Sequence, residues 1–394
     1  MGGGPPLDTG TVEPALGGAL CTAHAAVQEH RRALLDLRHR LGDSGCSLLV
    51  LFVSPSGDLG AIAAAAAEIF PGTPAVGCTT AGEICSHGYV EREVVAVGFP
   101  ASLFLARTAL LTGLKDLDPA CVAEIVARLS AEMGERAPGW DWDFAFLLID
   151  GLSRREDQIV AAMRLALGTL PLFGGSAGDG LDFRRTFVLA EGGFQDDAAV
   201  LTLVRSRCPI RVFRFDNFEP TDVRMVVTRA DPERRVVHEI NAEPAAREYA
   251  RLVGYDPDEL SPFTFASHPI VVRVGGHHHV RAIQKVEPNG DLTFFSAIDE
   301  GLVLTVAEAR PFAEHLESAL AELAADRRPE AIIACDCILR RLAVEEVQGL
   351  REVSRILAEH HVVGFSTYGE QFSSVHVNQT LTGVAIYPPE DGAR

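Results

Sequence analysis

The sequence predicts an α/β fold made of two related α/β domains, each built on βαβ units with additional antiparallel strands. The first observation behind this prediction is that three stretches echo one another, at residues 76–83, 173–179 and 363–370. Each stretch closes the same pattern of an apolar strand-like run, a helix-like run and a second short apolar strand. In each case the glycine turn follows the start of the first strand by roughly 30 residues, which is the length of one βαβ unit.

The second observation is the size and composition of the chain. At 394 residues it is too long for one ordinary core, so two domains are expected. Hydrophobic residues make up 47% and charged residues 23%, which is the profile of a globular protein. We predict a disordered Gly- and Pro-containing tail over 1–14, because it lacks apolar anchors. The N-terminal domain is predicted over 15–210 and the C-terminal domain over 211–394.

The first half shows alternating helix and strand signals. A helix is predicted over 20–41, since Leu34 and Leu41 recur on one side and Gly42 follows. The alanine-rich run over 59–70 is a second helix, which Pro71 must follow rather than extend. The other predicted elements of this half are a helix at 119–132 and strands at 47–53, 93–99, 103–110, 144–150, 185–190 and 198–204.

The second half begins with a predicted linker over 208–220. Gly254 ends a helix over 245–253, and the turn Pro288-Asn289-Gly290-Asp291 predicts a hairpin. A last βαβ unit starts at the strand 331–335. The other predicted elements of this half are a helix at 307–325 and strands at 224–229, 235–240, 280–286, 292–297 and 382–387.

Charge and cysteine usage exclude several classes of protein. The net charge of −19 argues against nucleic-acid binding, which draws on clustered Lys and Arg. No apolar run approaches the ~20 residues that span a bilayer, and the opening residues do not form a signal peptide. The eight cysteines are scattered, which indicates reduced thiols and not a disulfide framework. We therefore predict a cytoplasmic protein with no membrane or nucleic-acid partner.

The echoed stretches combine glycines, hydroxyls and carboxylates where ligands of open α/β sheets bind. One interpretation is a polar cradle for the carboxylate or amine of a small ligand. The other is local turn chemistry, because Ser and Thr often bond their own backbone and carboxylates often cap neighbouring segments. The candidate ligand-binding residues are Gly77, Thr79, Thr80, Glu83, Ser176, Asp179, Ser366, Thr367 and Glu370.

The residues 76–83, 173–180 and 364–383 resemble the FIST domain, a bacterial sensory module with an N-terminal and a C-terminal half. The closing run, with His376-Val377-Asn378-Gln379-Thr380 just after Glu370, resembles the NosP-type members of that family. This resemblance implies a haem-binding sensor of nitric oxide that regulates a signalling enzyme. The enzyme would be a histidine kinase of a two-component system or a cyclic-di-GMP enzyme. The resemblance adds Asn378 to the ligand-binding candidates and is compatible with a homo-oligomer.

His376 is the predicted axial ligand of the haem iron. It lies between Val375 and Val377, so its side chain should point away from theirs in an extended segment, and neutral imidazole is a good iron ligand. A hydrogen-bonded histidine near a turn is the alternative. Arg340 and Arg341 are candidates for binding the haem propionates, or else they form the solvated first turn of a helix.

Other histidines and cysteines are weaker candidates. His277, His278 and His279 are expected at an exposed strand start, and His87 is a lesser axial candidate. Cys208-Pro209 has the form of a haem-regulatory dipeptide. Cys78, with His87 as base and Glu83 as orienter, would make an enzyme, but the equivalent positions Gly175 and Phe365 are not nucleophilic.

Three functions follow in order of preference. The first is the haem-binding nitric-oxide sensor, and the second is a sensor of the same fold for a small, amino-acid-like metabolite without haem. The third, a hydrolase or transferase that uses Cys78, is disfavoured, so we predict that the protein is not an enzyme. The chain has no kinase, P-loop or cyclase motif, so its output must come from a partner.

Overall fold

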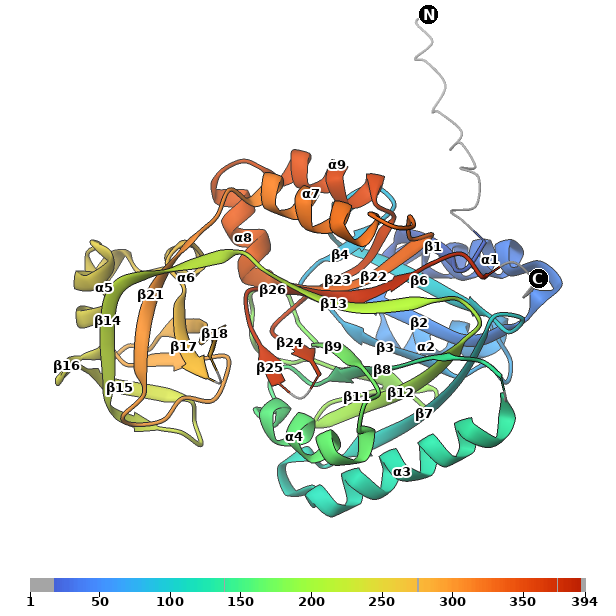
Figure 1. The fold of residues 1–394 in the computed structure, drawn as a ribbon, viewed down its shortest axis with the longest axis horizontal. Coiled ribbons are helices and arrows are strands. Elements are labelled where there is room, and N and C mark those ends of the chain that lie inside the picture. Colours follow the sequence, from blue (N-terminus) through green and yellow to red (C-terminus); the bar gives the residue numbers. More distant parts are fainter. Residues whose placement is uncertain (1–17, 138, 275, 374, 391–394) are drawn as a thin grey trace, which may run out of the picture.

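The computed structural model describes residues 18–137, 139–274, 276–373 and 375–390. The predicted tail over 1–14 lies outside them. Within these ranges the strands form three six-stranded sheets, which make up the body of the molecule, and one eight-stranded sheet. Figure 1 shows the eight-stranded sheet, with α5 (Ala245–Val253) and α6 (Pro262–Ser267), to the left of the body. We call residues 218–309 the module.

Each six-stranded sheet contains one of the three predicted βαβ units, and its two strands are parallel. The mixed α/β class is therefore confirmed. Additional antiparallel strands flank each pair, as predicted. The units are β2 (Cys46–Val53), α2 (Leu59–Ile69) and β3 (Ala75–Thr79); β8 (Trp142–Ile149), α4 (Glu156–Leu167) and β9 (Leu172–Ser176); and β22 (Ala331–Cys337), α8 (Ile338–Glu346), α9 (Leu350–Glu359) and β23 (Val362–Thr367).

After each βαβ unit, the next strand of the chain pairs with a strand of another sheet. The three pairings connect the three sheets in a closed circle. After β3, strand β4 (Glu83–Cys85) pairs with β23. After β23, strand β24 (Glu370–Phe372) pairs with β9, and after β9, strand β10 (Val188–Ala190) pairs with β3. Strands β4 and β24 each pair with a strand on the other side of the predicted boundary at residue 210. The sheets therefore join segments from both predicted domains.

The three sheets pack around one shared apolar core. Phe52 stacks on Phe365 with ring centroids 4.8 Å apart, and Phe146 stacks on Phe173 at the same separation. The outer face of each sheet is covered by its own helices. These are α1 (His30–Leu41) and α2 on the first sheet, α3 (Pro119–Arg136) and α4 on the second, and α7 (Phe312–Leu323) and α9 on the third.

Gly77, Gly174 and Gly364 lie within the second strand of each parallel pair and not in a turn. A Cβ atom at these positions would lie 2.1, 2.1 and 1.8 Å from the carbonyl oxygens of Leu51, Leu147 and Ala334. Real Cβ atoms do not approach that closely. The echoed glycines therefore allow neighbouring strands to approach, which is a known role of glycine in strand interiors.

The module has its own core, which includes Met225, Tyr249 and Phe265. Strand β13 (Ile210–Asp216) leads into its long strand β14 (Phe218–Asp231), and β21 (Val303–Ala309) leads back toward α7. A second apolar cluster, with Phe295 from the module and Tyr368 from the body, lies between the two parts. The module's remaining strands are β15 (Val236–Ile240), β16 (Glu243–Pro244), β17 (Ile270–Val274), β18 (His277–Val280), β19 (Ile283–Val286) and β20 (Leu292–Phe294).

Three predicted elements differ from the structure. The predicted helix 20–41 begins as strand β1 (Cys21–Ala26), which pairs with β6 (Glu93–Pro100). The predicted helix 307–325 starts only at Phe312, because β21 occupies the preceding residues. The predicted linker 208–220 contains β13, which pairs with the last strand, β26 (Thr380–Ile386). In each case pairing with a distant strand overrides the local signal.

The predicted strands at 185–190 and 198–204 lie in different sheets as β10 and β12 (Ala198–Ser206). Strand β10 pairs with β11 (Gly193–Gln195), and β12 lies between β8 and β7 (Phe104–Thr112). None of the described helices is long and apolar enough to cross a membrane.

Candidate functional site

The three echoed turns meet at one junction, and backbone hydrogen bonds link them in a ring. The N–H of Ala81 donates to the carbonyl of Ser366, at 2.9 Å. The N–H of Tyr368 donates to Ser176 at 3.3 Å, and the N–H of Gly178 donates to Thr79 at 2.9 Å. Donors and acceptors occupy equivalent positions of the three repeats, so the turns form one unit with approximate threefold symmetry.

The five candidate hydroxyl residues of the turns are buried, and most of their hydroxyls already form hydrogen bonds within the protein. Thr79 accepts from the N–H of Phe187, and Thr80 donates to Glu83. Thr367 donates to the carbonyls of Ser176 and Gly369, at 2.7 and 2.8 Å. These contacts are the local turn chemistry that the sequence allowed as an alternative. Among the described residues, the Ser366 Oγ has no hydrogen-bond partner.

The predicted carboxylates also have structural partners. Asp179 accepts from the N–H groups of Phe183, Arg184 and Arg185 at 2.8–2.9 Å, which fixes the loop after β9. Glu370 accepts from the N–H and the hydroxyl of Thr380. Burial raises the pKa of Glu83 to about 7 and the pKa of Glu370 well above its usual range, which makes both carboxylates easier to protonate.

His376 lies in β25 (Val375–Val377) and is fully buried. Its ring packs on the backbone of Gly369, where a Cβ would lie 2.3 Å from Cε1. The Nδ1 atom lies 3.4 Å from Nε2 of Gln371. Among the described residues, Nε2 of His376, Oε1 of Gln371 and Oδ1 of Asn378 have no hydrogen-bond partner. Such buried polar atoms are costly unless a water or a ligand satisfies them.

Charged side chains from the body and the module affect the pKa of His376. Burial lowers its pKa, and the charges of Glu156, Asp157, Arg235 and Arg281 modify that shift. Helix α4, whose first turn holds Glu156 and Asp157, packs against β25. We call the set of these seven residues the junction cluster. Its members are Glu156, Asp157, Arg235, Arg281, Gln371, His376 and Asn378.

Within the described residues, some charged groups of the junction cluster form hydrogen bonds and others do not. Arg235 donates to Glu156 at 2.7 Å and to Asp157 at 3.3 Å, and the backbone N–H of Ala297 also donates to Asp157 at 3.3 Å. Nε and Nη1 of Arg281 have no hydrogen-bond partner within the described chain. Burial lowers the pKa of Arg281. The charge of Arg281 acts on His376, and a half-buried guanidinium with free donors can bind the carboxylate of a small ligand.

Arg340 and Arg341 are buried, so they do not form a solvated first turn. Arg340 forms an ion pair with Asp336 at 2.6 Å and lies over the ring of Phe312. Arg341 pairs with Glu91 at 2.7 Å. Both guanidiniums are therefore already paired with carboxylates from the chain itself.

The catalytic group considered as an alternative around Cys78 is not assembled. Cys78 lies in the shared core, and burial raises the pKa of its thiol well above the usual range. His87 lies 3.9 Å from the Sγ of Cys85, not beside Cys78, and Glu83 bonds Thr80. Cys208 is also a buried core residue. His278 and His279 are half-buried on β18, not exposed as expected; the side chain of His277 lies outside the described set.

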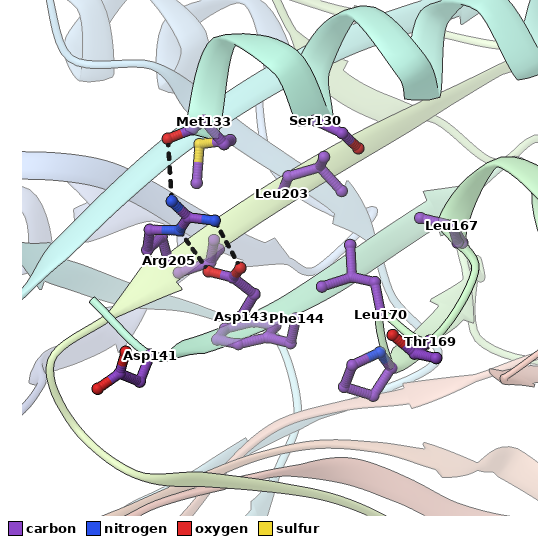
Figure 2. A pocket seen from close by; sticks show the side chains of 12 residues that line it. Ser130, Met133, Asp141, Asp143, Phe144, Leu167, Thr169, Leu170, Leu203 and Arg205 are labelled. Atoms are coloured by element: carbon purple, nitrogen blue, oxygen red, sulfur yellow. Dashed lines mark hydrogen bonds and ion pairs between the residues drawn. The ribbon is translucent and has the colours of Figure 1, made fainter. Parts of the chain in front are cut away.

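A separate surface pocket of about 340 Å³ lies beneath α3 (Figure 2). Arg205 crosses it and forms a two-pronged ion pair with Asp143, at 2.7 and 2.8 Å. The pocket lies where β8 and β9 begin. Ligands of α/β sheets bind at the opposite, carboxyl ends of the strands, where the junction cluster lies.

The interface where the strand ends of a mixed α/β body meet a second module over buried polar side chains is a common place for a ligand-binding site. Comparison with known protein families identifies the family of this chain. A FIST N domain model matches residues 47–243 and a FIST C domain model matches residues 245–373. The chain belongs to the FIST family, whose domains have a sensory role in signal transduction.

The two family matches meet inside the module, at β16, and not at the predicted boundary of residue 210. His376 lies beyond the end of the FIST C match. The chain is also similar to an uncharacterized protein of Methanocaldococcus jannaschii. The two are 23% identical over 349 residues, which cover 78% of this chain and 67% of the relative.

Proposed function

We propose that this FIST protein senses a small, amino-acid-like ligand bound by the junction cluster between the body and the module. The observation that carries the proposal is the set of buried polar atoms on Gln371, His376 and Asn378 that have no hydrogen-bond partner among the described residues. Arg281 would bind the ligand's carboxylate, and Asp157 its amino group. Amide and imidazole groups would complete its hydrogen bonds.

Binding at this place would couple the ligand to the arrangement of the two parts. Arg281 and Arg235 belong to the module, whereas Glu156 and His376 belong to the body. A ligand that contacts both parts favours the arrangement in which both sets of contacts form. The changed surface would then regulate a partner enzyme in the cytoplasm, such as a histidine kinase or a cyclic-di-GMP enzyme.

The haem hypothesis has one supporting feature, the Nε2 atom of His376, which has no hydrogen-bond partner within the described chain. The other features around it do not fit a porphyrin, which packs both of its faces in an apolar slot. The ring of His376 is fully buried against Gly369, and its neighbours are Gln371 and charged residues. As oriented, Gln371 donates to Nδ1, which leaves the proton on Nε2 where the iron would need a lone pair. Haem and nitric oxide therefore take second place to the metabolite.

The test is a thermal-shift screen of the purified protein against the free amino acids, alongside an absorption spectrum with added haem. We expect one class of amino acid to raise the melting temperature, and neither its decarboxylated amine nor its deaminated acid to do so. A Soret band that saturates with added haem and disappears in His376→Ala, with no amino acid shifting the melting temperature, would overturn the proposal in favour of the haem sensor.

A further inference from the structure

A second group of potential ligands lies outside the junction cluster, near the first echoed turn. His24 comes from β1, Cys85 ends β4, and His87 lies in the turn before β5 (Gly88–Val90). One ligand atom from each of the three side chains lies within 4.8 Å of the others. The rings of His24 and His87 meet edge to face, with centroids 5.3 Å apart. Segments distant in sequence thus bring one sulfur and two imidazoles to one point.

A carboxylate fixes the orientation of the His24 ring. Its Nδ1 atom lies 2.6 Å from a carboxylate oxygen of Glu93. When Nδ1 donates its proton to a carboxylate, Nε2 has a free lone pair and a fixed direction. The Nε2 atom lies 3.5 Å from Oγ of Ser86, next to Cys85 and His87. Carboxylate–histidine–metal arrangements of this kind orient metal ligands and raise their basicity.

We propose that His24, Cys85 and His87 bind a divalent transition-metal ion, with Zn²⁺ as the best match, and that Glu93 positions His24. The donor set decides the class of metal: a thiolate with two imidazoles suits Zn²⁺ or Co²⁺, whereas Mg²⁺ and Ca²⁺ require oxygen ligands.

The geometry needs only a small adjustment. Bonds of about 2.0–2.3 Å to a tetrahedral ion require the ligand atoms to be closer than they are now. Cys85 Sγ and His87 Nδ1 are 3.9 Å apart. His87 is exposed and His24 is half-buried, so their side chains can turn while the buried Cys85 remains in place. The exposed side leaves a fourth position for water or another ligand.

The site would join two sheets of the body. His24 belongs to the first sheet, whereas the β4–β5 hairpin that carries Cys85 and His87 belongs to the third. A bound ion would therefore hold the hairpin against β1. Since the hairpin continues from the first echoed turn, the metal would stabilise the junction without contacting the junction cluster.

The test is a titration of the metal-free protein with Co²⁺, followed by absorption spectroscopy. We expect a sulfur-to-cobalt charge-transfer band and the strong visible bands of tetrahedral Co²⁺, which saturate at one ion per chain and disappear when Zn²⁺ is added. In His87→Ala the tetrahedral bands should be lost with the fold intact, since His87 is exposed. Cys85→Ser should lose the charge-transfer band. Glu93→Gln should weaken binding about 10- to 100-fold.

The matched controls are His39→Ala and Cys121→Ser, both at exposed positions of helices. Both should retain the parent spectrum. The absence of a charge-transfer band in the parent protein would contradict the site. So would an unchanged Co²⁺ spectrum in His87→Ala, or loss of the charge-transfer band in Cys121→Ser, because each would mean that other side chains bind the ion.

Discussion

The hydroxyl of Tyr368 donates a hydrogen bond to the carboxylate of Asp179, and the backbone N–H of Asp179 donates back to the same hydroxyl at 3.1 Å. The two residues belong to the third and the second echoed turn. The ring of Tyr368 also contacts Phe183 of the body and Phe295 of the module, with centroids 4.7 and 5.9 Å away. Tyr368 therefore links the turn junction to the interface between the two parts.

Tyr368→Phe should lower the free energy of unfolding by about 1–3 kcal/mol, because a buried carboxylate loses a hydrogen-bond donor. Chemical denaturation measures the change. Tyr255→Phe is the control, since Tyr255 is partly exposed, and it should leave the stability nearly unchanged. Equal stability of Tyr368→Phe and the parent protein would show that the bond contributes nothing.

Gly174→Ala should destabilise the protein by about 3 kcal/mol or more, because the added Cβ would overlap the carbonyl oxygen of Leu147 and force the strands apart. Gly193→Ala is the matched control, since a Cβ there meets no atom within 4 Å. Denaturation midpoints of the two variants give the comparison. A Gly174→Ala protein as stable as Gly193→Ala would rule out the close approach of the strands.

Arg235→Met should destabilise the protein by about 3–5 kcal/mol, because it leaves the carboxylate of Glu156 buried and unpaired. Adding Glu156→Gln to the same chain should recover part of the loss, which a double-mutant cycle measures. Arg229→Met, at the exposed ion pair with Glu239, should cost at most about 1 kcal/mol. If both arginine variants lost the same amount, the buried pair would have no special role.

His376→Gln should change how stability depends on pH. Burial lowers the pKa of His376 in the folded state, so below about 6.5 the unfolded chain binds a proton that the folded chain does not. The parent protein should therefore lose stability as the pH falls below that value, and His376→Gln should lose less. The exposed His39→Gln should follow the parent. Identical pH profiles of the parent and His376→Gln would contradict the assigned burial.

The sequence predicted the three βαβ units, because their apolar runs and spacing are local signals. It assigned Gly77, Gly174 and Gly364 to turns, whereas they lie within the second strand of each parallel pair. It did not predict the circular exchange of strands, since the pairing of β4 with β23 joins residues 83–84 to residues 364–365. The short strand at 21–26 was missed for the same reason: its partner in β6 lies far along the chain.

Part of the candidate site could be predicted and part could not. His376 and Asn378 were candidates because the closing run resembles the NosP-type members, and both are members of the junction cluster. Arg235, Arg281, Glu156 and Asp157 were not, because charged residues are common and only the packing of the module against α4 brings these four together. The candidate hydroxyls and carboxylates of the turns are buried there, but most of them form hydrogen bonds with the turns and the neighbouring segments.

The most direct test of the central claim is calorimetric titration of the amino acid that gives the largest thermal shift into the parent protein, Arg281→Gln and Arg247→Gln. Arg247 is exposed on α5 of the module and serves as the matched control. If the junction cluster is the site, binding should weaken about 10-fold or more in Arg281→Gln, since a charged hydrogen bond is lost, and should stay unchanged in Arg247→Gln. Equal affinity of all three proteins for that amino acid would contradict the account.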